Sequence, residues 1–414
     1  MSEDLNKLQN AYKLHQQGRL VEAASIYEQL IRRDSKNYDA LHLLGTIKAS
    51  LGEFVEAQKL LERSLGSKKN KIAYVENYAS ILFLSRDYER AVQICTKTIK
   101  ENDNTETIQY VLAISLYKKN RLDEAIKQFG LLLSLYPNHL AGNNEKASVL
   151  AELEQYDEAL SYIEKALTIN PRYAEAFLNK GNVLGKLKRY DDSILAYKQA
   201  LAINPNIPDV HLGCGNVFWN LKRYDEAFAA YDKALTIKPD LEGAWIGRGN
   251  VFYDLRRYDE AFAAYDKTLT IKPDLENAWL GRGNVFYSLN RDEEALTCYD
   301  KAISLKKDLP DGYWNKSLLK LSLGEYEEGW QLYEWRWKNK RFTSPVRNFS
   351  QPPWLGNDSI VGKTILVHSE QGFGDTIQFY RYLSKLKTLG CEIVFETQVP
   401  LAPLIKAQRD NCKS

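Results

Sequence analysis

The prolines Pro171, Pro205, Pro239 and Pro273 recur at a constant spacing, every 34 positions, and this period constrains the fold more than any other feature of the sequence. Extended in both directions, the period divides residues 1–340 into ten units without an insertion. The expected first residues of the units are Met1, Ser35, Lys69, Asp103, Pro137, Pro171, Pro205, Pro239, Pro273 and Lys307. Such a period indicates a solenoid, in which every unit buries its apolar face against its neighbours.

Two columns of small residues run through the units. The eleventh position is occupied by Ala11, Gly45, Ala79, Ala113, Ala147, Gly181, Gly215, Gly249, Gly283 and Ser317. Twelve positions later stand Ala23, Ala57, Ala91, Ala125, Ala159, Ser193, Ala227, Ala261, Ala295 and Gly329. Because two helices approach closely only where their side chains are small, each unit is predicted to be a hairpin of two packed helices.

The unit that begins at Pro239 illustrates the predicted boundaries. Bulky residues recur there with helical spacing, which places a first helix near residues 241–255 and a second near 258–271. Pro273 ends the second helix. Arg257 is a poor N-cap, whereas Glu260 in the first turn favours the positive end of the helix dipole.

Residues 1–340 resemble the tetratricopeptide-repeat family, through the 34-residue period and through segments such as Ala244-Trp245, Gly249-Asn250 and Tyr258-Asp259-Glu260-Ala261. The resemblance implies an all-α, right-handed superhelical solenoid of ten helical hairpins. It also implies that the first helix of each hairpin lines a concave surface that binds proteins or extended peptides.

Two rows of asparagines are the candidate peptide-binding residues. One row lies at a single repeat position and comprises Asn182, Asn216, Asn250 and Asn284. An amide suits this role because it offers a donor and an acceptor to a peptide backbone. The alternative is that asparagine is common at this position of such repeats and does not contact a peptide. A second row, three positions earlier, resembles the asparagine ladder of O-linked N-acetylglucosamine transferases. It comprises Asn77, Asn179 and Asn315 and is interrupted by Gly213, Gly247 and Gly281.

The two ends of the array differ in character. The first unit carries polar residues on its first helix, which predicts a solvated cap: Asn6, Lys7, Gln9, Gln16 and Gln17. The last unit instead crowds Trp330, Trp335 and Trp337 into its second helix. An exposed patch of that kind is unfavourable, so these tryptophans are expected to dock the segment that follows.

The repeat pattern stops at residue 340, and residues 341–353, which contain three prolines, form a predicted connector. Beyond it, residues 364–368 are predicted to form a strand, 369–374 a turn, 375–389 a helix and 392–396 a second strand. This is a βαβ unit.

The run from Trp354 through the segment 367–375 to Pro400 resembles the start of the glycosyltransferase region in bacterial tetratricopeptide-repeat fusion proteins. That region is similar to GT-B enzymes, which include heptosyltransferases and O-linked N-acetylglucosamine transferases. The resemblance implies that residues 354–414 are an incomplete, C-terminally truncated first half of a Rossmann-like domain. A turn at Gly372 and Gly374 would then lie near the anion or nucleotide sugar. Asp375 would be the candidate base for the acceptor hydroxyl, or simply a helix cap.

Two main functions follow from these patterns, and a purely structural assembly subunit is a third possibility. The first is an interaction scaffold, the recognition arm of a glycosyltransferase-like protein. The alternative is a protein glycosyltransferase that takes a nucleotide sugar as its substrate. We expect the 414-residue chain not to act as an enzyme unless a second domain half is supplied, and we expect no cofactor.

Charge and composition limit the classes of partner that the sequence predicts. With 56 Lys+Arg against 54 Asp+Glu, the chain has no basic surplus that would favour nucleic acid or an anionic membrane surface. A polar N-terminus and the lack of a long apolar run predict a cytoplasmic protein without membrane insertion. The histidines are scattered, and no CxxC pair occurs, so no metal site is expected. The cysteines are expected to act as small hydrophobes: Cys95, Cys214, Cys298, Cys391 and Cys412.

Overall fold

The computed structural model describes residues 2–67, 71–101, 104–339, 342, 344, 346–356, 358–370 and 372–411. Three of the expected unit starts, Met1, Lys69 and Asp103, lie outside these residues, and so does Cys412. The backbone divides into two compact units, Met1–Pro273 and Asp274–Ser414.

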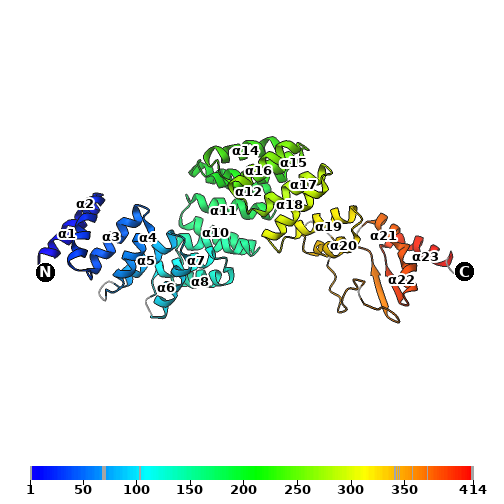
Figure 1. Cartoon of the computed structure of the whole chain (residues 1–414), viewed down its shortest axis with the longest axis horizontal. Helices are drawn as coiled ribbons and strands as arrows, with labels where there is room; N and C mark the ends of the chain where they lie inside the picture. The colour runs from blue at the N-terminus through cyan, green and yellow to red at the C-terminus, as the bar shows by residue number, and fades with distance from the viewer. Residues whose placement is uncertain are drawn as a thin grey trace. The chain divides into compact units, whose positions relative to one another are not determined.

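The first unit is entirely helical where it is described (Figure 1). Its helices are α1 (Ser2–Gln16), α2 (Leu20–Arg33), α3 (Tyr38–Ser50), α4 (Phe54–Ser64), α5 (Lys71–Leu84), α6 (Tyr88–Lys100), α7 (Glu106–Lys118), α8 (Leu122–Leu135), α9 (Leu140–Glu152), α10 (Tyr156–Ile169), α11 (Ala174–Lys186), α12 (Tyr190–Ile203), α13 (Pro208–Asn220), α14 (Tyr224–Ile237), α15 (Glu242–Asp254) and α16 (Tyr258–Ile271).

The second unit adds two further helix pairs and a small sheet. Its elements are α17 (Glu276–Ser288), α18 (Asp292–Leu305), α19 (Pro310–Ser322), α20 (Tyr326–Tyr333), the 3₁₀ helix η1 (Glu334–Lys338), β1 (Thr364–His368), α21 (Phe373–Tyr380), α22 (Tyr382–Thr388), β2 (Glu392–Glu396), the 3₁₀ helix η2 (Val399–Leu401) and α23 (Ala402–Asn411). From α1 to α20, the odd-numbered helices are called A helices and the even-numbered ones B helices below.

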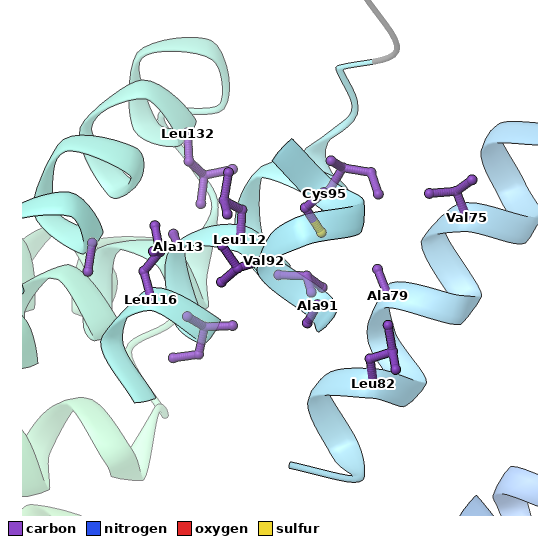
Figure 2. Packing of buried hydrophobic residues seen from close by; sticks show 14 of the residues in the cluster. Val75, Ala79, Leu82, Ala91, Val92, Cys95, Leu112, Ala113, Leu116 and Leu132 are labelled. Carbon is purple, nitrogen blue, oxygen red and sulfur yellow. The ribbon is translucent and has the colours of Figure 1, made fainter. Parts of the chain in front are cut away.

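The small residues of the two columns lie where the helices of each pair meet. Every member of both columns is buried, and the Ser193 hydroxyl of α12 donates directly to the Gly181 carbonyl of α11 over 2.7 Å. Figure 2 shows the packing in one stretch, where Ala79, Ala91 and Ala113 lie among larger aliphatic side chains. The prediction of paired helices held together through small residues is confirmed.

Cysteines behave as small hydrophobes in the part of the chain that the structure describes. Cys95, Cys298 and Cys391 are buried, and Cys214 is half-buried. Burial raises the pKa of the Cys95 thiol to about 12, so that thiol stays protonated and unreactive near neutral pH.

Each A helix turns into its B helix through one residue in the left-handed conformation. These residues recur every 34 positions: Gly18, Gly52, Arg86, Asn120, Glu154, Lys188, Lys222, Arg256, Asn290 and Gly324. The B helix then begins at the predicted place, since α16 spans Tyr258–Ile271. Arg257 makes no capping bond to a backbone N–H, but its Nε donates to the Glu260 carboxylate over 2.9 Å.

The predicted strands are confirmed. They pair in parallel with Leu366 opposite Val394. The predicted single helix over 375–389 is wrong in its bounds. Gly372 takes a left-handed φ of 52° as N-cap, so helix α21 begins already at Phe373, and the chain breaks into a second helix after Tyr380.

The tryptophans of the last pair make mostly local contacts. Trp335 stacks on Tyr313 with ring centroids 3.9 Å apart, and Trp330 keeps 50% of its surface exposed. The turn after β1 is held instead by Arg336, whose Nη2 lies 2.9 Å from the Glu370 carboxylate. The predicted place of Trp335 and Trp337 in the second helix of the last unit is wrong, because α20 ends at Tyr333 and both residues lie in η1. Arg336, which makes the connection, lies in η1 as well.

Candidate peptide-binding surface

Successive A helices lie next to one another within each unit. Their backbones come into contact along the series α3, α5, α7, α9, α11, α13 and α15, and again between α17 and α19. Successive B helices make no comparable approach among the described residues. The A helices therefore line the inner side of the stack in each unit, which is the side where the resemblance to tetratricopeptide repeats implies that partners bind.

The second row of asparagines connects neighbouring A helices. The Asn179 side-chain amide donates to the side-chain oxygen Oδ1 of Asn144 over 2.9 Å and to the Ser148 hydroxyl over 3.0 Å. Asn77 Nδ2 lies 3.0 Å from His42 Nε2 in the same way. These amides are already engaged with their neighbours, so this row fixes the spacing of the A helices.

The first row of asparagines is held by tyrosines from the B helices. In four pairs the tyrosine hydroxyl donates to the amide oxygen: Tyr197 to Asn182 over 2.7 Å, Tyr231 to Asn216 over 2.9 Å, Tyr265 to Asn250 over 2.8 Å and Tyr299 to Asn284 over 3.0 Å. The Asn182 and Asn216 side chains are exposed, and those of Asn250 and Asn284 are half-buried. Each tyrosine hydroxyl thus donates to the amide oxygen of its asparagine. This bond fixes the orientation of the amide and of its NH₂ group, which remains as a donor.

The same tyrosines explain why the second row is interrupted. A Cβ added at Gly213 would lie 2.5 Å from Cζ and from the hydroxyl oxygen of Tyr197, and one at Gly247 would collide with Tyr231. Glycine is needed because the ring of the preceding B helix fills that space. The pair before Asn179 carries Ile163 at the position of Tyr197.

Asn315 is the exception, since it follows a pair that carries Tyr299. Its amide donates to the Asn284 carbonyl oxygen over 2.8 Å, and Tyr299 donates to that same oxygen. The two asparagine rows therefore meet at Asn284, which makes this the point where the amide oxygen is most fully occupied.

Glu145 and His42 are among the side chains on the A helices whose pKa values are shifted by burial. Burial raises the pKa of the Glu145 carboxyl, an effect that Lys118 opposes. Burial lowers the pKa of His42 to about 4 although Asp39 opposes it, and the His42 ring stacks on Tyr74 at 4.0 Å. His42 is therefore neutral near pH 7, so its ring Nε2 can accept a hydrogen bond from the side-chain amide of Asn77.

The residues at the C-terminal glycine turn lie in the second unit. Gly372 precedes α21, and Gly374 is the second residue of that helix. Asp375 follows in its first turn with an exposed side chain, while Thr376 is buried and its hydroxyl donates to the Gly372 carbonyl over 3.0 Å. Within the described residues, no group of three or more His, Cys, Asp or Glu side chains is arranged to hold a metal ion.

A repeated ion pair between neighbouring hairpins was missed by the sequence patterns above. A base on an A helix pairs with an acid of the preceding B helix, at a constant offset of sixteen positions along the chain. Examples are Lys180 with Glu164 at 2.6 Å, Arg248 with Asp232, and Lys316 with Asp300 at 2.8 Å. The sequence contains a signal for these pairs: an acidic residue stands sixteen positions before a basic one, and this arrangement recurs with the 34-residue period.

Three solved structures are similar to this chain. A tetratricopeptide repeat protein from Parabacteroides merdae has 18% identity and a TM-score of 0.43, covering 72% of this chain and 98% of that one. A thermophilic TPR protein of Thermus thermophilus has 22% identity and a TM-score of 0.41, covering 44% and 99%. Yeast Tom70 has 12% identity and a TM-score of 0.48, covering 82% and 92%.

The length and composition of a helix determine whether it could span a membrane. Across the parts of the chain that the structure describes, none of the helices combines the length and apolar character that a bilayer span requires.

Matches to models of protein families assign the chain to a family. Models described as tetratricopeptide or TPR repeats match residues 14–77, 140–206, 178–242, 249–290 and 283–324. Another, described as anaphase-promoting complex, cyclosome, subunit 3, matches residues 65–131. The chain therefore belongs to the tetratricopeptide-repeat proteins, which are generally scaffolds for protein–protein interaction.

Proposed function

We propose that the inner face formed by the A helices binds extended polypeptide segments, and that the row Asn182, Asn216, Asn250 and Asn284 makes the central contacts. The observation that carries this proposal is the tyrosine hydroxyl on each amide oxygen. An amide whose acceptor is already used presents its NH₂ group, which suits the carbonyl oxygens of a peptide backbone. Asn77, Asn179 and Asn315 support the row by spacing the A helices.

The proposal also includes the boundaries of the domains along the chain. We assign residues 1–340 to a right-handed array of ten hairpins, with the unit boundaries given by the 34-residue period. Residues 341–353 form the connector, and 354–414 a separate segment with Rossmann-like connectivity around β1 and β2. The array is the recognition part of the molecule.

The test uses the four substitutions Asn182→Asp, Asn216→Asp, Asn250→Asp and Asn284→Asp together. Aspartate keeps the oxygen that accepts from tyrosine but removes the NH₂ donor. A random dodecapeptide library displayed on phage is selected on the wild-type chain and on this variant. We expect the enrichment of binders to fall at least about tenfold in the variant, as the loss of one or more hydrogen bonds predicts.

A matched control changes a row on the B helices that has the same spacing. It carries alanine at the exposed residues Gln199, Lys233, Lys267 and Lys301. This variant is expected to keep the wild-type enrichment. Equal enrichment by the asparagine variant and the wild type, at equal thermal stability, contradicts the proposal.

A second candidate function is transfer of a sugar from a nucleotide sugar to a protein, with Asp375 as base and Gly372 and Gly374 at the donor. The observation that favours it is the parallel pairing of β1 and β2 around a glycine turn and a helix. Incubation with radiolabelled nucleotide sugars and a cell lysate tests it. Label incorporated by the wild type but not by Asp375→Asn supports it, and no incorporation rejects it for this chain.

A further inference from the structure

A hollow of about 490 Å³ opens between the B helices α8 and α10, beside the connection from α8 to α9. Its walls include Gly130 and Leu133 from α8, Pro137 from the connection, and Tyr162 and Lys165 from α10. The B helices supply most of this wall, so the hollow is separate from the asparagine rows of the A helices.

Gly130 stands at a repeat position where several other hairpins carry an acid, although Thr96 and Lys198 occupy it in two of them. In the repeated ion pairs, Glu164, Asp232 and Asp300 each precede their base by the same sixteen positions. The residue at that offset after Gly130 is Lys146. The junction between α8 and α9 thus keeps the base of the pattern, Lys146 on α9, but lacks the carboxylate on α8.

Space for the missing carboxylate is present. A Cβ built on Gly130 meets no atom within 4 Å, whereas a Cβ on most glycines of this array would meet a neighbouring side chain. Gly130 is also part of the wall of the hollow. The volume that an acidic side chain fills elsewhere is therefore open at this hairpin.

Lys146 is left with uncharged partners. Only 8% of its surface is exposed. Lys146 lies behind the wall of the hollow, and its ammonium donates over 2.7 Å to the hydroxyl of Tyr162, a residue of that wall, and lies 4.1 Å from the centre of the same ring. It forms no ion pair with a residue that the structure describes. A buried ammonium without a counter-ion is unfavourable, so this site favours an anion from outside.

Lys165 adds a second positive charge. Its ammonium lies 4.4 Å from the centre of the Tyr162 ring, so both lysines approach the same aromatic side chain. Leu133, Pro137 and Ile169 add apolar surface to the wall, which also contains the polar residues Ser134, Asn138, Asn143 and Thr168. An occupant should therefore combine one negative charge with adjacent apolar atoms.

We propose that this hollow binds an acidic side chain of a polypeptide partner, whose carboxylate takes the place that Glu164, Asp232 and Asp300 occupy in the other hairpins. An apolar residue next to that acid would pack on Leu133 and Ile169. The site is a second docking point, on the B-helix side of the array, and it is independent of peptide binding by the asparagine rows.

The probe is the fluorescently labelled peptide acetyl-Leu-Glu-Leu-amide, and its glutamine counterpart is the reference. Binding to the full chain is measured by fluorescence anisotropy at low salt. The wild type should bind the glutamate probe at least about tenfold more tightly than the glutamine probe, as a charge-assisted hydrogen bond predicts. Lys146→Met should abolish this preference.

Two substitutions at one position give the sharpest test. Gly130→Asp supplies the carboxylate from within the chain, so it should remove the preference for the glutamate probe and raise the melting temperature. Gly130→Ala leaves the hollow and Lys146 unchanged and should keep the preference. A preference that survives Gly130→Asp, or that is absent from the wild type, overturns the proposal. Tighter binding of inorganic phosphate than of the glutamate probe also overturns it.

Discussion

The guanidinium of Arg336 grips the Glu370 carboxylate with two nitrogens, Nε at 3.2 Å and Nη2 at 2.9 Å. The Arg336 side chain is only 8% exposed and lies over the Tyr333 and Trp337 rings at 4.7 and 4.6 Å. Glu370 lies just beyond the first strand, and the turn that follows leads into α21. This ion pair therefore ties the sheet segment to the last helical hairpin.

Replacing Arg336 should loosen the sheet segment. Arg336→Met leaves the Glu370 carboxylate partly buried without its partner, and we expect a loss of about 2–4 kcal/mol in local stability. Hydrogen exchange of the backbone amides in Thr364–His368 measures this as faster exchange. Arg347→Met serves as the control because the Arg347–Glu396 pair is more exposed and should contribute less than about 1 kcal/mol. Unchanged exchange in the Arg336 variant would show that the sheet stands without this contact.

Left-handed residues at the A–B turns offer a stability gain. Lys222 has a φ of 57° and Arg256 a φ of 59°, and both side chains are exposed. Glycine adopts this conformation without the Cβ clash, so Lys222→Gly and Arg256→Gly should each stabilise the chain by about 0.5–1 kcal/mol. Denaturant unfolding measures the gain.

The reverse change is the control for that prediction. Gly52 has a φ of 79°, and a Cβ there meets no atom within 4 Å, so any cost of Gly52→Ala arises from the backbone alone. We expect a destabilisation of about 1 kcal/mol. A gain in stability on Gly52→Ala would contradict the explanation for all three turns.

Much of the array could be predicted from the sequence, because the constraint repeats. The two columns of small residues located the helix contacts, and the second helix of the Pro239 unit was placed correctly at Tyr258–Ile271. What could not be predicted were contacts between side chains of different helices. The tyrosine–asparagine bonds, the acid–base pairs between neighbouring hairpins and the Arg336–Glu370 pair all depend on how helices face one another in space.

The interrupted asparagine row can be restored only if the tyrosine is removed. Gly213→Asn should destabilise the first unit by about 2–3 kcal/mol, because its side chain enters the space of the Tyr197 ring. Tyr197→Ile copies the Ile163 arrangement and makes room. In the double variant the cost of Gly213→Asn should therefore shrink to less than about 1 kcal/mol, a coupling measured by a double-mutant cycle. Additive costs would show that the ring does not determine the glycine.

His42 should make the first unit sensitive to acid. Burial lowers its folded pKa to about 4 from the ordinary value of 6.5, so between these values the unfolded chain binds the extra proton. The stabilisation from the neutral, buried ring is fully present above the unfolded pKa of 6.5 and is lost as the pH falls toward 4. Lowering the pH from about 7.5 to about 5 should cost about 2 kcal/mol of unfolding free energy.

Comparison with His42→Gln isolates this contribution from the carboxylates that titrate at lower pH. Glutamine has no titratable ring, and its amide oxygen can still accept from Asn77. Urea unfolding of both proteins at about pH 7.5 and about pH 5 should show a drop in the wild type that is about 2 kcal/mol larger than in the variant. Burial also lowers the pKa values of His15, His139 and His211, but these rings are present in both proteins, so the difference between wild type and variant isolates His42. Equal drops in the two proteins would mean that the ring is protonated in the folded state and that the Asn77–His42 contact between α5 and α3 forms in a different way.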